Sequence, residues 1–313
     1  MPVPTVIFAA AALAQLTTSA PSPPSLSAIP LPRAKIILRY AGREAERPVP
    51  FEVVKGVIVF KLTVAGREAS AILDNGAQQS LLDEAFARAA GLEVGAPDGT
   101  IVTLNGSAPK RRVSKVPLSV PGAFETEVPA MATMDMAALS KIVGRKIDFV
   151  FGADFFGINV LAIDPARRML RIGPRGGARL PPTIPAFDLS GERPHIQVLV
   201  NDRPVSLEVD LGSNDMLVLT PEAWARVGEG VNSGVSVRNR DVTDHTKSTQ
   251  VQIERLPQVK LGPIQADNVT ASIKPWPISQ GDGSIGYGLL QRYLVIIDAG
   301  VNRMWLARPV PVP

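Results

Sequence analysis

Two stretches of the chain show the same succession of apolar and polar positions. In each, an alternating segment (57–64 and 195–200) reaches a short polar turn and returns as a second, largely apolar segment (67–73 and 203–209). Alternation of apolar and polar residues indicates a half-buried β-strand, and a short polar turn between two such runs indicates a β-hairpin. We therefore expect one β-hairpin in each half of the chain.

Each return segment ends in the same kind of motif, Asp-x-Gly followed by a small residue. The two motifs are Asp74-Asn75-Gly76 and Asp210-Leu211-Gly212, followed by Ala77 and Ser213. The two aspartates are 136 positions apart. Either motif alone is typical of a structural turn. Their occurrence after two similar hairpins makes the two aspartates candidate site residues.

A short helix is expected after each motif. The first is predicted to have Ser80 as its N-cap and to end before Gly91. The second is predicted to start at Thr220-Pro221 and to end at Gly228. These assignments follow the preference for Ser or Thr at the N-cap, for Pro in the first turn and for Gly beyond the last turn.

A second pair of segments supports an internal repeat. Residues 149–172 and 284–307 each contain an apolar strand that runs into Gly, a bulky apolar pair, a strand ending at Asp164 or Asp298, and a final strand. Two matching segments at nearly one offset indicate duplication. Asp164 and Asp298 lie beside turns, so we expect them to be structural. The prediction is an all-β protein, mainly β with short helices, made of two similar β-rich lobes.

The Gly- and Pro-rich residues between the two copies indicate a linker. Inside each copy, a turn-rich segment (100–116, with Asn105-Gly106, and 231–252) is expected to form a hairpin or loop over a cleft. The expected division is a lead-in at 21–50, lobe 1 at 51–173, a linker at 174–185 and lobe 2 at 186–313.

The N-terminus has the pattern of an export signal. Residues 6–16 are apolar but too few to span a bilayer, and small residues follow them. We expect residues 1–20 to be a signal peptide and the Pro/Ser-rich stretch after it to be a tether. The protein is therefore predicted to be exported, either periplasmic or secreted, with no stable membrane insertion.

Composition excludes several kinds of chemistry. The chain has no cysteine and only two histidines, His195 and His245, which rules out thiol catalysis and three-histidine zinc sites. The net charge of +4 is spread over 33 basic and 29 acidic residues, which does not indicate nucleic-acid binding. We expect the densest basic run, Lys110-Arg111-Arg112, to be a solvated hairpin tip. No metal or organic cofactor is predicted.

An apolar strand ending in Asp-x-Gly-small, followed by Leu-Leu and a short helix, resembles the pattern of the retropepsin-like aspartic proteases. The later strand with Gly152-Ala153-Asp154 is similar to that family's second signature, and the resemblance covers about 240 residues of this chain. It implies that the two similar lobes are small β-barrels that flank a cleft, and that each lobe supplies one catalytic aspartate. Because one chain would supply both lobes, as in pepsin, a monomer is expected.

The resemblance implies that Asp74 and Asp210 form a dyad that activates water to hydrolyse a peptide bond in an extended peptide or unfolded protein. Two close carboxylates share one proton, so one can accept a proton while the other donates. Gly76 and Gly212 would shape the turns where each loop approaches the opposing lobe and a Cβ would clash. Ala77 and Ser213 match the small residue that follows.

Family members usually carry Thr or Ser after the catalytic Asp, whereas this chain has Asn75 and Leu211. An Asn side chain can donate and accept hydrogen bonds and a Leu side chain can do neither. Any link between the two loops is therefore expected to be one-sided, from Asn75 to backbone. The substitutions leave two alternatives to an endopeptidase: a pseudoprotease that binds peptides without cleaving them, and a structural β-protein with a vestigial cleft.

Overall fold

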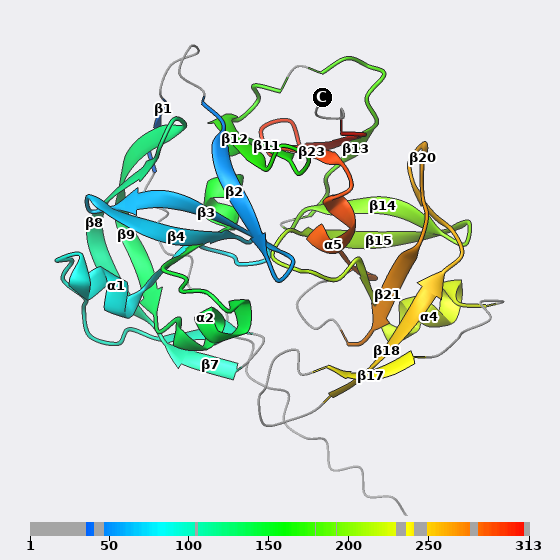
Figure 1. Cartoon of the computed structure of the whole chain (residues 1–313), viewed down its shortest axis with the longest axis horizontal. Helices are drawn as coiled ribbons and strands as arrows, with labels where there is room; N and C mark the ends of the chain where they lie inside the picture. The colour runs from blue at the N-terminus through cyan, green and yellow to red at the C-terminus, as the bar shows by residue number, and fades with distance from the viewer. Residues whose placement is uncertain are drawn as a thin grey trace, which may run out of the picture. The chain divides into compact units, whose positions relative to one another are not determined.

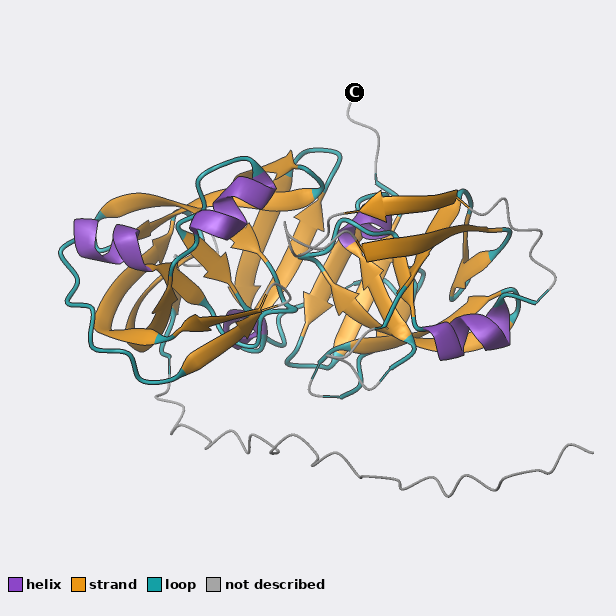
Figure 2. Cartoon of the chain, turned by 90° about the horizontal axis from the view of Figure 1, so that it is seen from below, coloured by secondary structure: helices purple, strands orange, loops and turns teal. Residues whose placement is uncertain are grey.

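Strands form most of the regular structure, and the helices are short (Figure 2). The computed structural model describes residues 36–40, 47–103, 106–178, 180–191, 193–229, 236–240, 249–275 and 281–309. The predicted signal peptide, nearly all of the tether, Asn105 and His245 lie outside these residues. Within the described residues there are 24 strands and five helices, as the predicted all-β fold requires.

The two predicted hairpins are present. In lobe 1, β3 (Val57–Val64) pairs with β4 (Arg67–Leu73), and in lobe 2, β14 (His195–Val200) pairs with β15 (Arg203–Asp210). Both turn residues of each hairpin have positive φ, 48° and 76° at Ala65-Gly66 and 50° and 61° at Asn201-Asp202. This is the geometry of a tight turn whose twist matches the twist of the strands it joins.

Lobe 1 contains a closed ring of six strands, because β8 pairs with both β3 and β9. Around the ring the strands are β3, β4, β10 (Phe149–Phe151), β5 (Leu81–Asp83), β9 (Phe124–Met134) and β8 (Arg111–Val120). The short β1 (Arg39–Tyr40) adds to β9. The strand β10 lies between β4 and β5 and runs parallel to β4, which places the end of β4 beside the end of a buried strand.

Lobe 2 repeats these pairings in a nine-stranded sheet (Figure 1). Its order is β17 (Ser236–Arg240), β18 (Thr249–Leu256), β21 (Val269–Ile273), β16 (Leu217–Leu219), β22 (Gly283–Gly286), β15, β14, β19 (Val259–Leu261) and β20 (Ile264–Ala266). β22 runs parallel to β15, as β10 does to β4, and β14 pairs with β19 as β3 pairs with β8. The described strands of lobe 2 form an open path. The long strands β8 and β9 of lobe 1 pair along their length and close the ring, whereas lobe 2 has two shorter pairs in their place, β18 with β21 and β19 with β20.

A sheet shared by both halves of the chain is the one large feature that the repeat does not predict. Its strands are β2 (Val49–Val54), β12 (Met169–Pro174), β11 (Asn159–Asp164), β23 (Leu294–Asp298), β24 (Arg303–Ala307) and β13 (Ala186–Asp188). The strand β11 of the first half lies antiparallel to β23 of the second, with Ala162 opposite Ile296. The two lobes are therefore joined by backbone hydrogen bonds as well as by the linker.

The aspartates at the ends of β11 and β23 organise turns, as expected. Asp298 is fully buried, and its Oδ1 accepts hydrogen bonds from the Gly176 N–H at 2.7 Å and the Gly300 N–H at 2.8 Å. Asp164 accepts from the backbone and side chain of Arg167, at 3.1 and 2.9 Å. The buried Asp298 thereby ties the start of the linker to the β23–β24 turn.

The first predicted helix start is wrong by three residues. α1 (Glu84–Ala89) has Asp83 as its N-cap, which accepts from the Phe86 N–H at 2.9 Å, because Leu81-Leu82-Asp83 form β5 instead of the first turn. The second prediction is confirmed: α4 (Pro221–Val227) has Thr220 as its N-cap. The remaining helices are α2 (Ala137–Val143), α3 (Ala153–Phe156) and α5 (Tyr287–Leu290).

The two predicted hairpin segments contain paired strands. β6 (Thr100–Thr103) pairs with β7 (Gly106–Pro109), and β17 pairs with β18. The basic run does not form a hairpin tip: Arg111 begins β8, and its guanidinium lies 3.3 Å from Glu84, while Arg112 pairs with Asp98. These residues connect β8 to the segment around Asp98 and to α1.

Apolar side chains of both lobes form the main core, and a second apolar cluster covers the outer face of β4. Ile72, Val59 and Val150 are at most 5% exposed, and they pack with residues of α2 such as Val143. No helix in the described part of the chain is long and apolar enough to cross a membrane.

Candidate active site

Asp74 and Asp210 lie together, each at the carboxyl end of a strand with a parallel neighbour. Asp210 is the last residue of β15 and pairs with Gly286 of β22. Asp74 directly follows β4, and its N–H donates to the Phe151 carbonyl of β10 at 3.0 Å. The Oδ1 atoms of the two aspartates lie 3.1 and 3.2 Å from one point, the position that a Cβ on Gly76 would take. The fold thus brings two residues 136 positions apart into one site.

The two motif glycines make this approach possible. A Cβ on Gly212 would lie 2.4 Å from Oδ1 of Asp74, closer than any real Cβ contact. A Cβ on Gly76 would occupy the space between the two carboxylates. A side chain at either position would therefore displace the aspartates or fill the place where a reacting molecule would sit.

Asn75 joins the two loops. Its side chain is 3% exposed, and its Nδ2 donates to the Val209 carbonyl at 2.5 Å, while its Oδ1 accepts from the Leu211 N–H at 2.8 Å. Both partners flank Asp210 in the chain. One amide therefore holds both sides of the opposing aspartate, in the one-sided arrangement expected from Asn75. Leu211 is fully buried and contributes its backbone to this link.

Backbone donors hold each carboxylate. Oδ1 of Asp74 accepts from the N–H groups of Gly76 at 3.0 Å and Ala77 at 3.3 Å, and Oδ1 of Asp210 accepts from Gly212 at 3.0 Å. The Ser213 N–H donates to the Asp210 carbonyl at 3.4 Å and closes the second turn. Two of the six motif neighbours also use their side chains: Asn75 through its amide, and Ser213 through its hydroxyl, which accepts from the Asp215 N–H at 3.2 Å.

Burial raises the pKa of both aspartates. For Asp74, loss of hydration outweighs the opposing backbone hydrogen bonds from Ala77 and Gly76. For Asp210, burial comes first and the Asp74 carboxylate second, and together they raise its pKa to about 7. Two close carboxylates cannot both ionise readily, so the pair holds one proton over a range of pH in which an exposed Asp would be ionised.

Residues behind the first aspartate form the second motif seen in the sequence. Asp154 Oδ1 accepts from the Ser80 N–H at 2.9 Å and from the Ser80 hydroxyl at 2.7 Å, and the Gly152 N–H donates to that hydroxyl at 2.8 Å. Ser80, expected at a helix start, therefore belongs to this network. In lobe 2, Gly288 takes the corresponding place, where a Cβ would lie 2.3 Å from the Asn214 carbonyl oxygen.

Sequence reasoning missed one charged pair beside the site. Glu208, two residues before Asp210 on β15, is 1% exposed, and its Oε1 lies 2.6 Å from Nη1 of Arg193. Glu208 stands among the apolar residues of β15, and an acidic residue in such a strand was a signal in the sequence that could have identified it. Arg193 precedes β14 and carries no local pattern that links it to the site.

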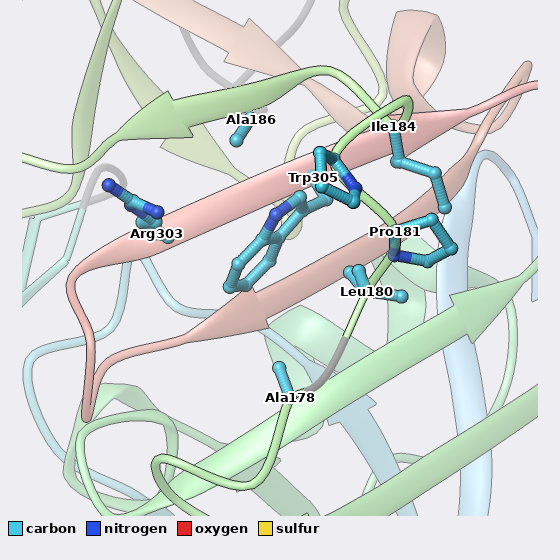
Figure 3. Close-up of a pocket in the computed structure, with 8 residues that line it drawn as sticks. Ala178, Leu180, Pro181, Ile184, Ala186, Arg303 and Trp305 are labelled. Carbon is cyan, nitrogen blue, oxygen red and sulfur yellow. The ribbon is translucent and has the colours of Figure 1, made fainter.

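A hollow lined by residues of the linker and β24 does not include either aspartate. It has a volume of about 750 Å³ and lies between the linker and β24 (Figure 3). Its lining is mostly apolar, with Trp305 and Arg303 from β24 against Leu180, Pro181 and Ile184 of the linker. Neither Asp74 nor Asp210 is among its lining residues.

In each of the two β lobes, a buried strand ends at an Asp-x-Gly turn. This arrangement defines a two-lobed protein of the acid-protease type. The family model described as Aspartyl protease matches the chain twice, over residues 60–155 and 196–290. The chain belongs to this aspartyl protease family. Each matched region contains one of the two Asp-x-Gly motifs. The comparison with curated proteins gives no match.

Proposed function

We propose that the protein is an aspartic-type endopeptidase that hydrolyses peptide bonds with Asp74 and Asp210 as its catalytic pair. The observation that carries the proposal is the meeting of the two carboxylates, whose Oδ1 atoms lie within 3.2 Å of one point. Membership in the aspartyl protease family supports the same reaction class.

In the proposed mechanism, a water molecule lies between the two carboxyl groups. The ionised carboxylate takes a proton from this water, and the neutral carboxyl donates its proton to the oxygen of the scissile carbonyl. The resulting tetrahedral intermediate collapses with cleavage of the amide bond. Burial and the repulsion between the two carboxylates favour a state in which the pair shares one proton.

The Asn75 bridge supports catalysis over binding alone. A catalytic pair must be held to within a fraction of an ångström, and two hydrogen bonds at 2.5 and 2.8 Å fix the loop of Asp210 to that of Asp74. The Asn75 amide alone supplies the side-chain link between the two loops, because Leu211 has no polar side-chain group with which to form one. The chain therefore carries a link between the loops despite its unusual residues at both positions.

We further infer that the substrate is an extended peptide or an unfolded protein, bound between lobe 1 (51–173) and lobe 2 (186–313). Extended peptides can add to a sheet by main-chain hydrogen bonds. Both aspartates come from one chain, so a monomer suffices for a complete site. The N-terminal pattern leads us to propose export, to the periplasm or the outside of the cell.

The test is cleavage of an unfolded protein substrate by the full chain between about pH 3 and 7. Asp74→Asn and Asp210→Asn are compared with Asp164→Asn, a matched control that removes an aspartate from the end of β11. A bell-shaped profile that is lost in both dyad variants and kept in the control is expected. A folded parent that cleaves nothing at any pH, or cleavage that survives Asp74→Asn, would refute the proposal.

A further inference from the structure

The outer face of β15 carries a buried charge where lobe 1 carries a hydrocarbon. Val205, Leu207 and Val209 point into the apolar core of lobe 2, so Glu208 and Asp210 share the opposite face of the strand. Glu208 is 1% exposed, which is exceptional for a carboxylate. A second buried acid therefore lies two positions from the proposed catalytic one.

The strand pairings identify the counterpart of Glu208 in lobe 1. Ile72 is also two positions before its aspartate, and it pairs with Val59 on one side and Val150 on the other. Glu208 pairs with His195 and Ser284 in the same two relations. Three apolar side chains in lobe 1 thus correspond to three polar ones in lobe 2. The charge of Glu208 is consequently not a requirement of this fold.

Arg193 compensates the charge of Glu208. Their side chains are 19% and 1% exposed, and the ion pair measures 2.6 Å between Nη1 and Oε1. Burying an ion pair is costly, and an apolar pair is often equally stable, so stability alone gives no reason for this one. Its position two residues from Asp210 gives a different reason. Glu208 raises and Arg193 lowers the pKa of both Asp74 and Asp210.

Three other titratable groups lie close to β15. His195 lies opposite Glu208 on β14, and its Nδ1 is 2.7 Å from the Arg193 carbonyl. Behind the strand, Asp282 accepts from the Ser206 N–H at 2.9 Å and pairs with Arg226 of α4 at 2.7 Å, and Asp215 pairs with Lys274 at 3.1 Å. These two ion pairs use Arg226 and Lys274 as their cations, not Arg193.

We propose that Arg193 and Glu208 are positioning residues of the dyad, a buried ion pair that fixes the electrostatic field in which Asp74 and Asp210 exchange their shared proton. The catalytic importance of this shared proton rests on the proposed function. Its titration can be measured whether or not the protein is active. Neither residue touches the substrate in this role. Together they present the dyad with a nearly neutral neighbour, and removal of either one leaves a single buried charge beside it.

The experiment is a carbon-13 NMR titration of the aspartate carboxyls in the full chain, assigned with Asp74→Asn and Asp210→Asn. Glu208→Gln leaves Arg193 unbalanced and is expected to lower the midpoint of the shared proton by about one to two pH units. This is the effect of a unit charge two strand positions away, about 7 Å, at an effective dielectric constant of about 20. Arg193→Gln is expected to raise the midpoint, because the negative charge of Glu208 then acts on the two aspartates without the opposing guanidinium. The double variant is expected to return close to the parent.

The matched control is the exposed pair Arg203–Glu229 of the same lobe, whose side chains are 50% and 76% exposed. Its removal by Arg203→Gln and Glu229→Gln is expected to leave the midpoint unchanged. Equal shifts in this control, shifts of one sign in both Glu208→Gln and Arg193→Gln, or no shift in Glu208→Gln would overturn the proposal. If Glu208→Gln does not fold, Glu208→Ile makes the same change of charge with the residue that lobe 1 carries.

The titration also separates the two proposals. It needs no turnover, so a parent that cleaves nothing refutes the endopeptidase while the opposite shifts still test the ion pair. If the parent is active, the acidic and basic limits of its pH profile are expected to move with the same signs as the NMR midpoints. A merely structural role for the pair would lower stability in both single variants without opposite movements of the midpoint.

Discussion

Asn75→Ala is expected to lower both the free energy of unfolding and the rate of cleavage, because Asn75 links the loops of the two aspartates. The side chain is 3% exposed and makes two hydrogen bonds, to the Val209 carbonyl and from the Leu211 N–H. Alanine removes both and leaves a backbone acceptor and a backbone donor buried in the region between the lobes. Such groups cannot find water as replacements without opening the site.

Each buried polar group left without a partner costs about 1–3 kcal/mol, so for two groups the expected loss in the free energy of unfolding is about 2–6 kcal/mol. A suitable control is Asn214→Ala, because Asn214 also links the lobes, with Nδ2 donating to the Lys55 carbonyl at 3.1 Å, but is exposed. Water can replace that hydrogen bond, so the expected loss for the control is below about 1 kcal/mol.

Urea unfolding followed by circular dichroism measures both variants. With a slope of about 3 kcal/mol per M, a loss of about 3 kcal/mol lowers the midpoint by about 1 M. Cleavage of an unfolded substrate is measured without urea, at a pH at which both variants are folded. The rate is expected to fall at least about tenfold in Asn75→Ala, because a small misplacement of one aspartate lowers the rate of the chemical step. A midpoint for Asn75→Ala no lower than that of Asn214→Ala would refute the reasoning.

Two further predictions concern the same site. Gly212→Ala is expected to reduce both folding stability and the rate of cleavage more than Gly76→Ala does. The added Cβ would lie 2.4 Å from Asp74 Oδ1 at position 212, but 3.1 Å from it at position 76. Thermal melts and cleavage rates that rank the two variants in the opposite order would contradict this. Stability is expected to fall as pH rises from about 4 to about 7, because the pKa of Asp210 is raised to about 7 in the folded state and the folded chain therefore binds more protons than the unfolded chain in that range. Melting temperatures across this range are expected to fall less steeply in Asp210→Asn, and an equal slope would exclude the dyad as the cause.

Local patterns predicted the elements that depend on neighbouring residues. Alternation and turn residues identified both hairpins, and the preference for Thr and Pro identified the start of α4. The start of α1 was misplaced because Leu81-Leu82 is equally apolar as a strand or as a helical turn, and pairing with β10 decides for the strand. The repeat also placed the two aspartates in comparable positions, since equivalent strands carry them to equivalent ends.

Long-range pairing accounts for what the sequence did not reveal. The ion pair of Arg193 and Glu208 joins a loop residue to a strand residue, and only the folded arrangement brings them to the dyad. The contacts of Arg111 and Arg112 with Glu84 and Asp98 likewise depend on the path of β8. Charge alone suggested exposure for these residues, whereas their partners lie on other elements.

The register between β11 and β23 relates the two halves of the chain. Asp164 and Asp298 are equivalent positions of the two copies, and in the pairing Leu161 faces Ile297, Ala162 faces Ile296 and Ile163 faces Val295. Ala162 thus faces its own counterpart, and the residues on either side exchange partners symmetrically about it. This is the self-complementary register of a twofold dimer. The two halves of one chain therefore meet along this strand pair as two identical subunits would, although the halves differ elsewhere, with Asn75 in one and Glu208 in the other.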